Sequence, residues 1–549
     1  MSKQTASAAT AFTPVRMPRK LRSSPHLNKR TLAFGLFLLL TLRFREHFSE
    51  SERVGDKLQA WCGIVLAAIY FPGFHRDVNN DILWKRGFTE WTHFDELTTD
   101  GVTREPVRTP RRLYKLNYEV LRNQAKLARS QGVRVFVFYT YWFEHGRTAL
   151  FKPIRDLLPD RRLGTTFCVS WANEPWTARW DGMDGNRTLI FQKYGTTFDW
   201  AMHMEHLLPV FRHPDYLRID SKPVMFIYNL AHVVRAGAED VVRGDCAKFT
   251  QQIFGPGGAP AAQLYKKWYP DLNEIALEDL FQYHKLRGKV EGRDWPVLAC
   301  TESKIVELKR TRAEATLVNN STLLERMMTF FDAYARECGF GGIHIVGTIS
   351  PFVSAQDFDG MAANSPIQSA VQFAPFAYSD VLSRASQECG CATSTFSFHA
   401  NEELDPGCPP DCACFLGRLQ AAGVHRNKIF MPTSAANHGR RFFRGAFFSW
   451  SNFPRHAHDK IATSFCKKPN AHAFSLFVQD ALEAAVQDRC LATVDGENSA
   501  HSLVLVNAWN EWGEQAAIEP IEQDGHSALN AIRSAVQAVE SKIRFEVTV

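Results

Sequence analysis

The chain has 549 residues, 45% of them hydrophobic and 22% charged, which is ordinary for a globular protein with a large core. The formal net charge is +6, and part of it lies in the first 45 residues, which contain Lys and Arg but no acid. The remainder is close to neutral, which argues against a nucleic-acid-binding protein. Thirteen Trp, 13 Tyr and 41 Phe make the chain aromatic-rich, as carbohydrate enzymes and large cores both are.

The N-terminal residues are typical of a targeting segment rather than of a folded domain. A basic tail over 1–30 precedes an apolar run over 31–42, and a polar stem over 43–60 follows. The run is short for a membrane-spanning helix and matches the length of a signal h-region. Because no small-x-small cleavage site follows, we expect an uncleaved signal anchor in the Golgi or ER membrane, with a lumenal catalytic domain. A secreted protein, a transit peptide and a buried helix are the alternatives.

Eight short apolar runs predict the strands of a parallel sheet that is covered on both faces. In chain order they are 64–71, 133–142, 165–174, 222–229, 341–347, 370–375, 428–432 and 503–506. Helical spacing separates several of them, over 114–131, 152–158, 198–212 and 321–338. The alternation predicts an α/β fold, a (β/α)8 TIM barrel over 61–549 with insertions near 235–335 and 385–427.

The second insertion is rich in cysteine, with five of the chain's 12 cysteines between Cys389 and Cys414. In an oxidising compartment we expect disulfides to staple this loop. A zinc site is the alternative, although no CxxC pair is matched by a second one.

Polar and aromatic residues gather after the predicted strands. Because the carboxyl ends of parallel barrel strands meet on one face, we expect these residues to form the substrate site. The candidate substrate-binding residues are His75, Glu90, Trp91, Tyr141, Trp142, Trp171, Asn173, Glu174, Trp176, Asn510 and Trp512.

Several of these candidates have a plainer structural interpretation. His75 either donates a hydrogen bond to a substrate hydroxyl or holds its own loop. Glu90 either accepts a hydrogen bond from a sugar hydroxyl or forms a salt bridge with Arg86 or Arg112. Tyr141 and its neighbour Trp142 either stack on a sugar ring or pack at the rim of the barrel.

The last apolar run leads into Trp509-Asn-Glu-Trp-Gly-Glu514, where two carboxylates lie three residues apart between tryptophans. Burial beside indole rings raises a carboxyl pKa, and a neighbouring like charge separates the two pKa values further. The stretch therefore predicts an acid/base pair, Glu511 and Glu514, as the catalytic residues. Two alternatives stay open: the glutamates point to water above packed tryptophans, or Glu174 pairs with Glu511.

Several motifs in the same order resemble the WbsX-type family. They are Tyr70-Phe-Pro-x-Phe-His75, Gly87-Phe-Thr-Glu-Trp-Thr92, Tyr139-x-Tyr-Trp-Phe143, Trp171-Ala-Asn-Glu-x-Trp-Thr177, Arg218-Ile-Asp-x-Lys-Pro-Val224 and Asn507-Ala-Trp-Asn-Glu-Trp-x-Glu514. The resemblance covers roughly 65–235 and 340–525. That family is associated with O-antigen and other polysaccharide biosynthesis and is often labelled glycosyltransferase.

The WbsX-type family is in turn similar to glycoside hydrolase family ninety-nine, the endo-α-mannosidases, which are TIM barrels. The resemblance implies that Glu511 is the base that assists the sugar's own 2-hydroxyl, and that Glu514 is the general acid and then base. Two departures stand out. Gln515 replaces the family's glycine, and the predicted seventh-strand region lacks the expected tryptophan-aspartate before Asn437.

Three functions follow as hypotheses. The first is a glycosidase-type enzyme acting on an oligosaccharide or polysaccharide, without cofactor or metal, because no Walker loop, dinucleotide motif or metal-spaced histidine cluster is present. The second is a glycosyltransferase, for which Asp357-Phe-Asp359 is the one formal match to a nucleotide-sugar motif, with a solvated loop as the alternative. The third is a non-catalytic glycan-binding barrel.

Overall fold

The structure is a computed structural model of the chain, and it describes most of the region from residue 54 onward. The described ranges are 54–99, 108–110, 113–143, 147–158, 162–177, 188–236, 303–318, 321–350, 352–378, 440–455, 464–465, 471–488, 502–523 and 525–548. The predicted targeting segment, most of the first insertion and the cysteine-rich loop lie outside these ranges. Within the described part, no helix is long and apolar enough to cross a membrane.

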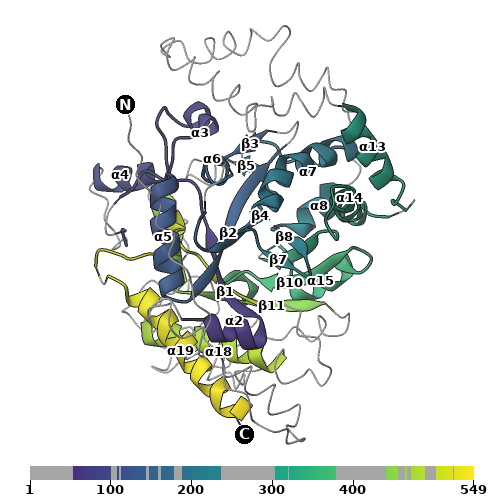
Figure 1. The fold of residues 1–549 in the computed structure, drawn as a ribbon. Coiled ribbons are helices and arrows are strands. Elements are labelled where there is room, and N and C mark those ends of the chain that lie inside the picture. Colours follow the sequence, from purple (N-terminus) through teal and green to yellow (C-terminus); the bar gives the residue numbers. More distant parts are fainter. Residues whose placement is uncertain are drawn as a thin grey trace, which may run out of the picture. The chain divides into compact units, whose positions relative to one another are not determined.

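Eight parallel strands form a closed barrel (Figure 1). In chain order they are β1 (Ile64–Tyr70), β2 (Val133–Trp142), β4 (Thr166–Trp171), β8 (Lys222–Ile227), β9 (His344–Ile349), β10 (Ile367–Gln372), β11 (Arg441–Phe447) and β14 (Ser502–Asn507). Each strand pairs with the next, β14 pairs with β1, and so the ring has no free edge. Their residues are almost all buried, as expected for strands between a filled interior and a helical layer. The predicted (β/α)8 architecture is confirmed.

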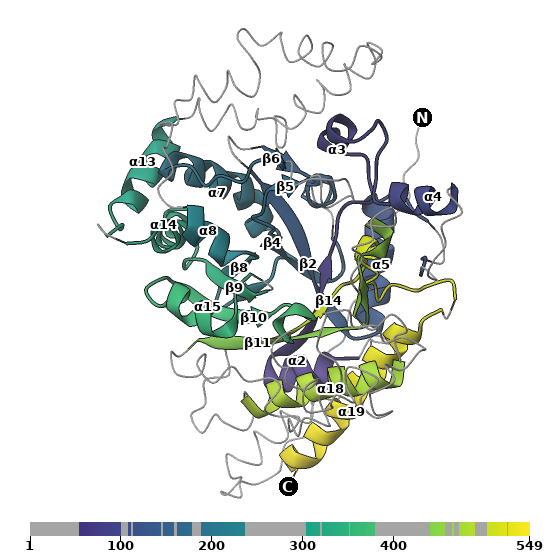
Figure 2. The same cartoon turned by 180° about the vertical axis from the view of Figure 1, so that it is seen from behind.

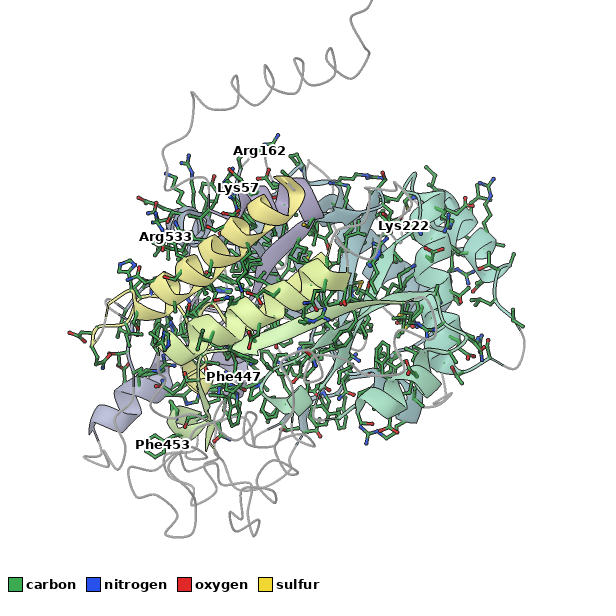
Figure 3. All side chains as sticks on the ribbon, turned by 90° about the horizontal axis from the view of Figure 1, so that it is seen from below. Lys57, Arg162, Lys222, Phe447, Phe453 and Arg533 are labelled. Carbon is green, nitrogen blue, oxygen red and sulfur yellow. The ribbon has the colours of Figure 1, made fainter. Side chains whose placement is uncertain are left out.

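Helices cover the outside of the barrel, as Figures 1 and 2 show from opposite sides. They are α2 (Asp56–Cys62), α3 (Val78–Leu83), α4 (Trp91–Thr99), α5 (Tyr118–Ser130), α6 (Lys152–Arg155), α7 (Thr197–Arg212), α8 (Leu230–Ala236), α13 (Ser303–Glu314), α14 (Leu323–Glu337), α15 (Ala355–Ala362), α18 (Ala471–Val486) and α19 (Ser527–Thr548). Their starts follow local chemistry, because Thr196 and Thr322 each form a capping box with an acid three residues later. Helices α18 and α19 lie side by side below the barrel (Figure 3).

Short elements decorate the strand ends. They are β3 (Thr148–Ala149), β5 (Trp176–Thr177), β6 (Thr188–Ile190), β7 (Arg218–Ile219), β12 (Trp450–Ser451), β13 (Ser464–Phe465) and the 3-10 turns η5 (Phe376–Tyr378), η8 (Phe453–Arg455) and η10 (Trp512–Glu514). Turn η8 follows β11 and turn η10 follows β14, and the two turns contact each other beyond the ends of these adjacent strands. Figure 3 labels Phe447 at the end of β11 and Phe453 in η8.

The seventh strand is not where the sequence predicted it. We expected it at 428–432, which lies outside the described residues, whereas the seventh of the described barrel strands is β11, which pairs with both β10 and β14. Its sequence begins Arg-Phe-Phe-Arg, so its charges conceal its apolar pattern. Arg444 is 2% exposed in the strand and forms a salt bridge of 2.6 Å with Asp488, just beyond α18. A buried arginine is tolerated when a carboxylate pairs with it, and that partner lies far along the chain.

The corrected position of the seventh strand also bears on one departure from the family pattern, the missing tryptophan-aspartate. The tryptophan expected near the end of the seventh strand is Trp450, in Trp450-Ser-Asn452, with serine in the place of the expected aspartate. The stretch that ends at Asn437 lies outside the described residues.

Candidate active site

Glu511 directly precedes η10 and Glu514 is its last residue, in a loop that closes on itself directly after β14. Ala508 and Ala516 pair through their backbones at 2.6 Å, and the amide of Ala516 donates to the carbonyl of Glu511 at 3.1 Å. Asn510 fixes the loop to the end of β1, because its side chain accepts from the Phe71 amide at 2.8 Å and donates to the Phe71 carbonyl at 3.0 Å. The loop that carries both carboxylates is therefore held at its base by the neighbouring strand.

Arg455 of η8 joins three carboxylates. Its Nη2 lies 2.7 Å from Oε1 of Glu511 and 2.7 Å from Oε1 of Glu90, and its Nη1 donates to Oε1 of Glu514 at 2.9 Å. The side chains of Arg455, Glu90 and Glu511 are less than a tenth exposed. Two nitrogens of one guanidinium thus hold the two predicted catalytic glutamates at one place. We call these four residues the Arg455 cluster.

The Arg455 cluster has more acid than base. Three ionised carboxylates around one guanidinium would leave a net charge of −2 in a buried site, which is costly. Burial raises the pKa of Glu511 well above its usual value, Arg455 lowers it in part, and the charges of Glu514 and Glu90 raise it again. The site therefore favours a neutral Glu511 beside other carboxylates, which is the separation of protonation states that an acid/base couple needs.

Trp450 completes the surroundings of Glu514. Its indole Nε1 donates to Oε2 of Glu514 at 2.7 Å, so both oxygens of this carboxylate accept hydrogen bonds. An aromatic chain leads away from Trp450: its ring meets Phe376 edge-on, Phe376 stacks on Phe373, and Phe373 meets Tyr228. The carboxylate pair is thus flanked by a wall of aromatic rings from β8, β10 and β11.

Three tyrosines, two on β2 and one directly after β8, lie within electrostatic reach of the carboxylates. Burial raises the pKa values of Tyr139, Tyr141 and Tyr228 well above the usual value, and the charges of Glu511 and Glu514 raise all three further. Their hydroxyls are therefore neutral donors near the acid pair. Tyr139 and Tyr141 lie two residues apart on β2, so their side chains point to the same face of the strand.

Glu174 is a further acid near the pair. The amide of Asn229 donates to its Oε1 at 2.7 Å. Burial raises its pKa to about 7, the Asn229 hydrogen bond lowers it, and the charge of Glu514 raises it. Glu174 therefore lies within electrostatic reach of Glu514 but outside the Arg455 cluster, where the sequence left open its pairing with Glu511.

A second buried glutamate supports the loop from beneath. Glu519 accepts hydrogen bonds from Gln124 at 2.6 Å, from Tyr114 at 3.0 Å and from the indole of Trp512 at 3.1 Å. Burial raises the pKa of Glu519 to about 7, and these three donors lower it. The indole of Trp512 is therefore held in place by Glu519.

Several predicted substrate-binding tryptophans lie in packing contacts. Trp142 stacks on His203 of α7, with the ring centroids 4.8 Å apart, and Trp171 packs against the same histidine. Trp91 donates to the Tyr114 carbonyl at 2.7 Å and packs against Phe74, while Trp512 is fully buried. Trp176 alone is half-buried, with its ring edge-on to Tyr141. Their predicted contact with a sugar stays a prediction, and the packing gives all but Trp176 a structural role.

The two predicted asparagines are buried clamps. Asn510 holds Phe71, as described above, and Asn173 accepts from the Asn229 amide and donates to the Asn229 carbonyl, both at 2.7 Å. Each is completely buried. Their side chains hold strand ends together, and they orient the glutamate that follows each of them.

His75 and Glu90 each make a structural contact of the kind that the sequence offered as an alternative, and their predicted contact with a sugar stays a prediction. Nδ1 of His75 donates to the Pro72 carbonyl at 2.7 Å, so the ring holds its own loop. Burial lowers its pKa to about 4, and so Nε2 of the neutral ring carries no proton and accepts rather than donates. Glu90 forms a salt bridge with Arg455, a partner that the sequence did not predict, whereas Arg112 lies outside the described residues.

Four residues of the site escaped the sequence prediction: Arg455, Trp450, Tyr139 and Tyr228. Tyr139 could have been predicted from the sequence, because strand alternation places it on the face opposite to that of Trp142. Trp450 and Arg455 were hidden by the misplaced seventh strand.

No metal site accompanies this arrangement in the part of the chain that the structure describes, where no three His, Cys, Asp or Glu side chains group as ligands. Asp357 accepts a hydrogen bond of 2.7 Å from Ser354, which caps α15. Both carboxylate oxygens of Asp359 are buried without a partner among the described residues. The Asp-x-Asp stretch is therefore the start of a helix rather than a solvated loop.

Comparison with known proteins gives a family match over most of the barrel. The family model described as glycosyltransferase WbsX matches residues 66–242 and 316–532. The uncharacterized protein WxcX of Xanthomonas campestris pv. campestris strain B100 is 38% identical over 166 residues, which are 30% of this chain and 24% of WxcX. The same figures hold for WxcX of strain ATCC 33913. The chain thus matches about a quarter of the length of these curated relatives.

Solved structures give weaker similarity. The GH99 endo-alpha-mannosidase from Bacteroides thetaiotaomicron aligns over 88% of this chain and 98% of its own, at 11% identity and a TM-score of 0.41. A chain described as a glycoside hydrolase-like protein aligns over 86% of this chain and 93% of its own, at 10% identity and a TM-score of 0.37. Scores this low support no conclusion, and the barrel rests on the strand pairing described above.

Proposed function

Because the chain belongs to the WbsX glycosyltransferase family, and so to a family of glycan-active enzymes, we propose that it cleaves or remodels glycosidic bonds in an oligosaccharide or polysaccharide. Glu511 and Glu514 are the catalytic couple. The reaction is of the glycosidase type, in which one carboxyl group protonates the leaving oxygen and the other activates the attacking group.

One observation carries the proposal: a single guanidinium holds the buried carboxyl group of Glu511 and the partly exposed one of Glu514, and the pKa of Glu511 is raised. A glycosidase couple needs one carboxyl group that gives a proton and one that takes it, at the same site. Burial favours the protonated form of Glu511, and Arg455 holds the neighbouring carboxyl groups in place.

The aromatic surroundings suit a sugar substrate. Tyr139, Tyr141 and Tyr228 place neutral hydroxyls near the couple, where they can hydrogen-bond to sugar hydroxyls. The bare Nε2 of His75 and the carboxyl group of Glu174 are further acceptors of the kind that fixes a sugar's orientation. These residues are proposed as substrate-binding, together with Glu90 and Trp176.

Two assignments of roles compete within the couple. The family resemblance makes Glu511 the base and Glu514 the acid. The raised pKa of Glu511 favours the reverse for the ligand-free site, because a group that holds a proton at neutral pH is ready to donate it. Substrates with different leaving groups distinguish the two assignments of acid and base.

The first test measures release of sugar from α-mannan and from released N-glycans by the full chain. Replacement of either glutamate, Glu511→Gln or Glu514→Gln, is expected to lower kcat by about 10²- to 10⁴-fold. With an aryl mannoside whose phenol is a good leaving group, the variant that lacks the acid recovers activity and the variant that lacks the base does not. Glu522→Gln, an exposed change on the same loop, is the control and retains activity.

Absence of turnover on all these glycans, or turnover that survives Glu514→Gln, would sink the proposal. Tight glycan binding without turnover, unaffected by Glu511→Gln, would instead identify a non-catalytic glycan-binding barrel.

A glycosyltransferase is the second candidate, and the buried, unpartnered carboxylate of Asp359 is the observation that favours it. Such a group can take part in holding a metal that bridges a nucleotide diphosphate. Calorimetry with a nucleotide sugar and Mn²⁺ tests this. Binding that is lost in Asp359→Asn and in Asp357→Ala would favour transfer over hydrolysis.

A further inference from the structure

Gln515, the residue after Glu514, has an unusual backbone conformation for a side chain of its kind. Its φ is 50° and its ψ is 20°, in the left-handed region where glycine is the unstrained choice. It is nevertheless a glutamine, and it is only 6% exposed. A strained residue at this position needs compensating contacts.

The side-chain amide of Gln515 is fully used. Its Oε1 accepts from the Arg108 amide at 2.7 Å, and its Nε2 donates to the Arg108 carbonyl at 3.1 Å and to the Trp512 carbonyl at 3.0 Å. The amide thus pairs with both backbone groups of Arg108. The pairing continues along the chain, since the Glu522 amide donates to the Thr109 carbonyl at 3.1 Å.

The backbone carbonyl of Gln515 is bound from the other side. It accepts from Oγ of Ser449 at 2.5 Å and from the guanidinium of Arg108. That guanidinium also binds Oγ of Ser449, donates to the Ala517 carbonyl at 3.3 Å and lies over the ring of Phe448. Three segments far apart in the sequence therefore meet at Gln515.

These segments are the ones that must be aligned for Glu514 to keep its partners. Ser449 directly precedes Trp450, which donates to Glu514, and Arg455 follows a few residues later. Gln515 directly follows Glu514. A shift between the β11 loop and the β14 loop would lengthen both hydrogen bonds of Glu514, so the contacts of Gln515 lock the distance on which they depend.

We propose that Gln515 and Arg108 are positioning residues that fix the Glu514 carboxyl group against Trp450 and Arg455. The inference rests on the proposed function, because it gives Gln515 a role in the reaction of the Glu511–Glu514 couple. The other reading of the same contacts is a local packing role, which would affect stability alone.

The test uses Gln515→Gly, which removes the amide and relaxes the backbone, and Gln515→Met, which keeps the length and removes the hydrogen bonds. Both are expected to lower kcat by about 10- to 100-fold with KM within about twofold, because a small displacement of a catalytic group is costly. Arg108→Ala, which keeps the backbone pairing and removes the guanidinium, is expected to give a smaller loss of kcat.

Ser221→Gly is the matched control. Ser221 has a φ of 61° in the turn between β7 and β8, where it is exposed and lies before β8 rather than at its carboxyl end. Glycine there relaxes the same kind of strain without touching the site, and kcat is expected to stay unchanged.

Hydrogen exchange measured by mass spectrometry supplies a readout that needs no activity. In both Gln515 variants, exchange is expected to rise in peptides that contain 108–110, 449–455 and 511–517, and to stay unchanged in Ser221→Gly. A rise at 108–110 alone, or an unchanged kcat in Gln515→Met, would overturn the proposal. If the wild-type chain shows no turnover, the proposed function fails, and exchange at 449–455 still decides whether Gln515 locks the two loops.

Discussion

The ends of β4 and β14 carry the same asparagine clamp, but the glutamates that follow the two clamps have different surroundings. Each strand runs into an asparagine followed by a glutamate, Asn173-Glu174 and Asn510-Glu511. Each asparagine binds both the amide and the carbonyl of one residue beyond the neighbouring strand, which is Asn229 after β8 and Phe71 after β1. The two clamps are alike in geometry and burial.

The glutamates after the clamps differ in their surroundings. Glu174 accepts a hydrogen bond from a neutral amide, whereas Glu511 meets a guanidinium that also holds two more carboxylates. The clamp therefore fixes where a glutamate lies, and its charged neighbours decide what it can do. A strand-end Asn-Glu pair alone does not distinguish a support residue from a catalytic one.

Removing the positive charge of Arg455, which lies among the carboxylates beyond β14, is expected to have the largest effect. Arg455→Met leaves the buried carboxylates of Glu90 and Glu511 without their counter-charge, so the free energy of unfolding should fall by about 3–5 kcal/mol. Urea unfolding measures this. Arg312→Met, which breaks the largely exposed pair with Glu337, is the control and should cost less than about 1 kcal/mol. Equal losses in the two variants would contradict the assignment of Arg455 as the organising charge.

Breaking the two clamps tests whether their roles differ. Asn510→Ala and Asn173→Ala each leave a buried amide and carbonyl unpaired, so both should lose about 2–4 kcal/mol of unfolding free energy. Activity should fall much further in Asn510→Ala, because Glu511 is the next residue. If Asn173→Ala costs as much activity, Glu174 belongs to the catalytic couple, as the sequence left open.

The pH dependence of stability tests Glu174. Its pKa is raised in the folded state to about 7 from 4.5, so its contribution is fully present below pH 4.5 and is lost as the pH rises through 7. Glu174→Gln should remove up to about 3 kcal/mol of that decline between pH 4.5 and 7.5. Glu519 has a pKa raised to about 7 as well, so part of the decline should remain in the variant. An unchanged stability profile would show that Glu174 is solvated.

The smallest effect is expected at β2, which lies between β1 and β4 in the barrel. Tyr141→Phe removes a hydroxyl near Glu511 and should raise KM about fivefold, as for the loss of one hydrogen bond, with unchanged stability. Trp142→Phe acts on the opposite face, against His203, and should lower stability and leave KM unchanged. The reverse pattern would mean that the strand's faces are assigned wrongly.

Much of the barrel could be predicted because its strands are apolar for a local reason. Strands buried on both faces read as largely apolar runs. Apart from Arg134 near the start of β2, the strands β1, β2, β8 and β14 contain such runs. Strand β11 does not, because Arg444 is neutralised by an aspartate that arrives with α18. A pattern within the strand cannot reveal a partner that only the fold provides.

The candidate site was predictable to the extent that its chemistry is local. Glu511 and Glu514 lie three residues apart, so their pairing is visible in the sequence. Arg455 has no such signal, because its three carboxylates come from two loops at distant positions. The tryptophans could not be assigned from the sequence for a related reason: indole rings at strand ends serve packing as readily as stacking, and the packing partners, such as His203 for Trp142, come from distant segments.

The pairing of β14 with β1 also orders events during synthesis. Strand β1 is made early and must wait for β14 before both of its edges are covered, since β14 is the last of the described strands. Glu90 emerges with the first part of the barrel, whereas Arg455, Glu511 and Glu514 all emerge near the end. A nascent chain thus carries an open barrel until the closing strand arrives, so the Arg455 cluster is complete only after β14 has been made.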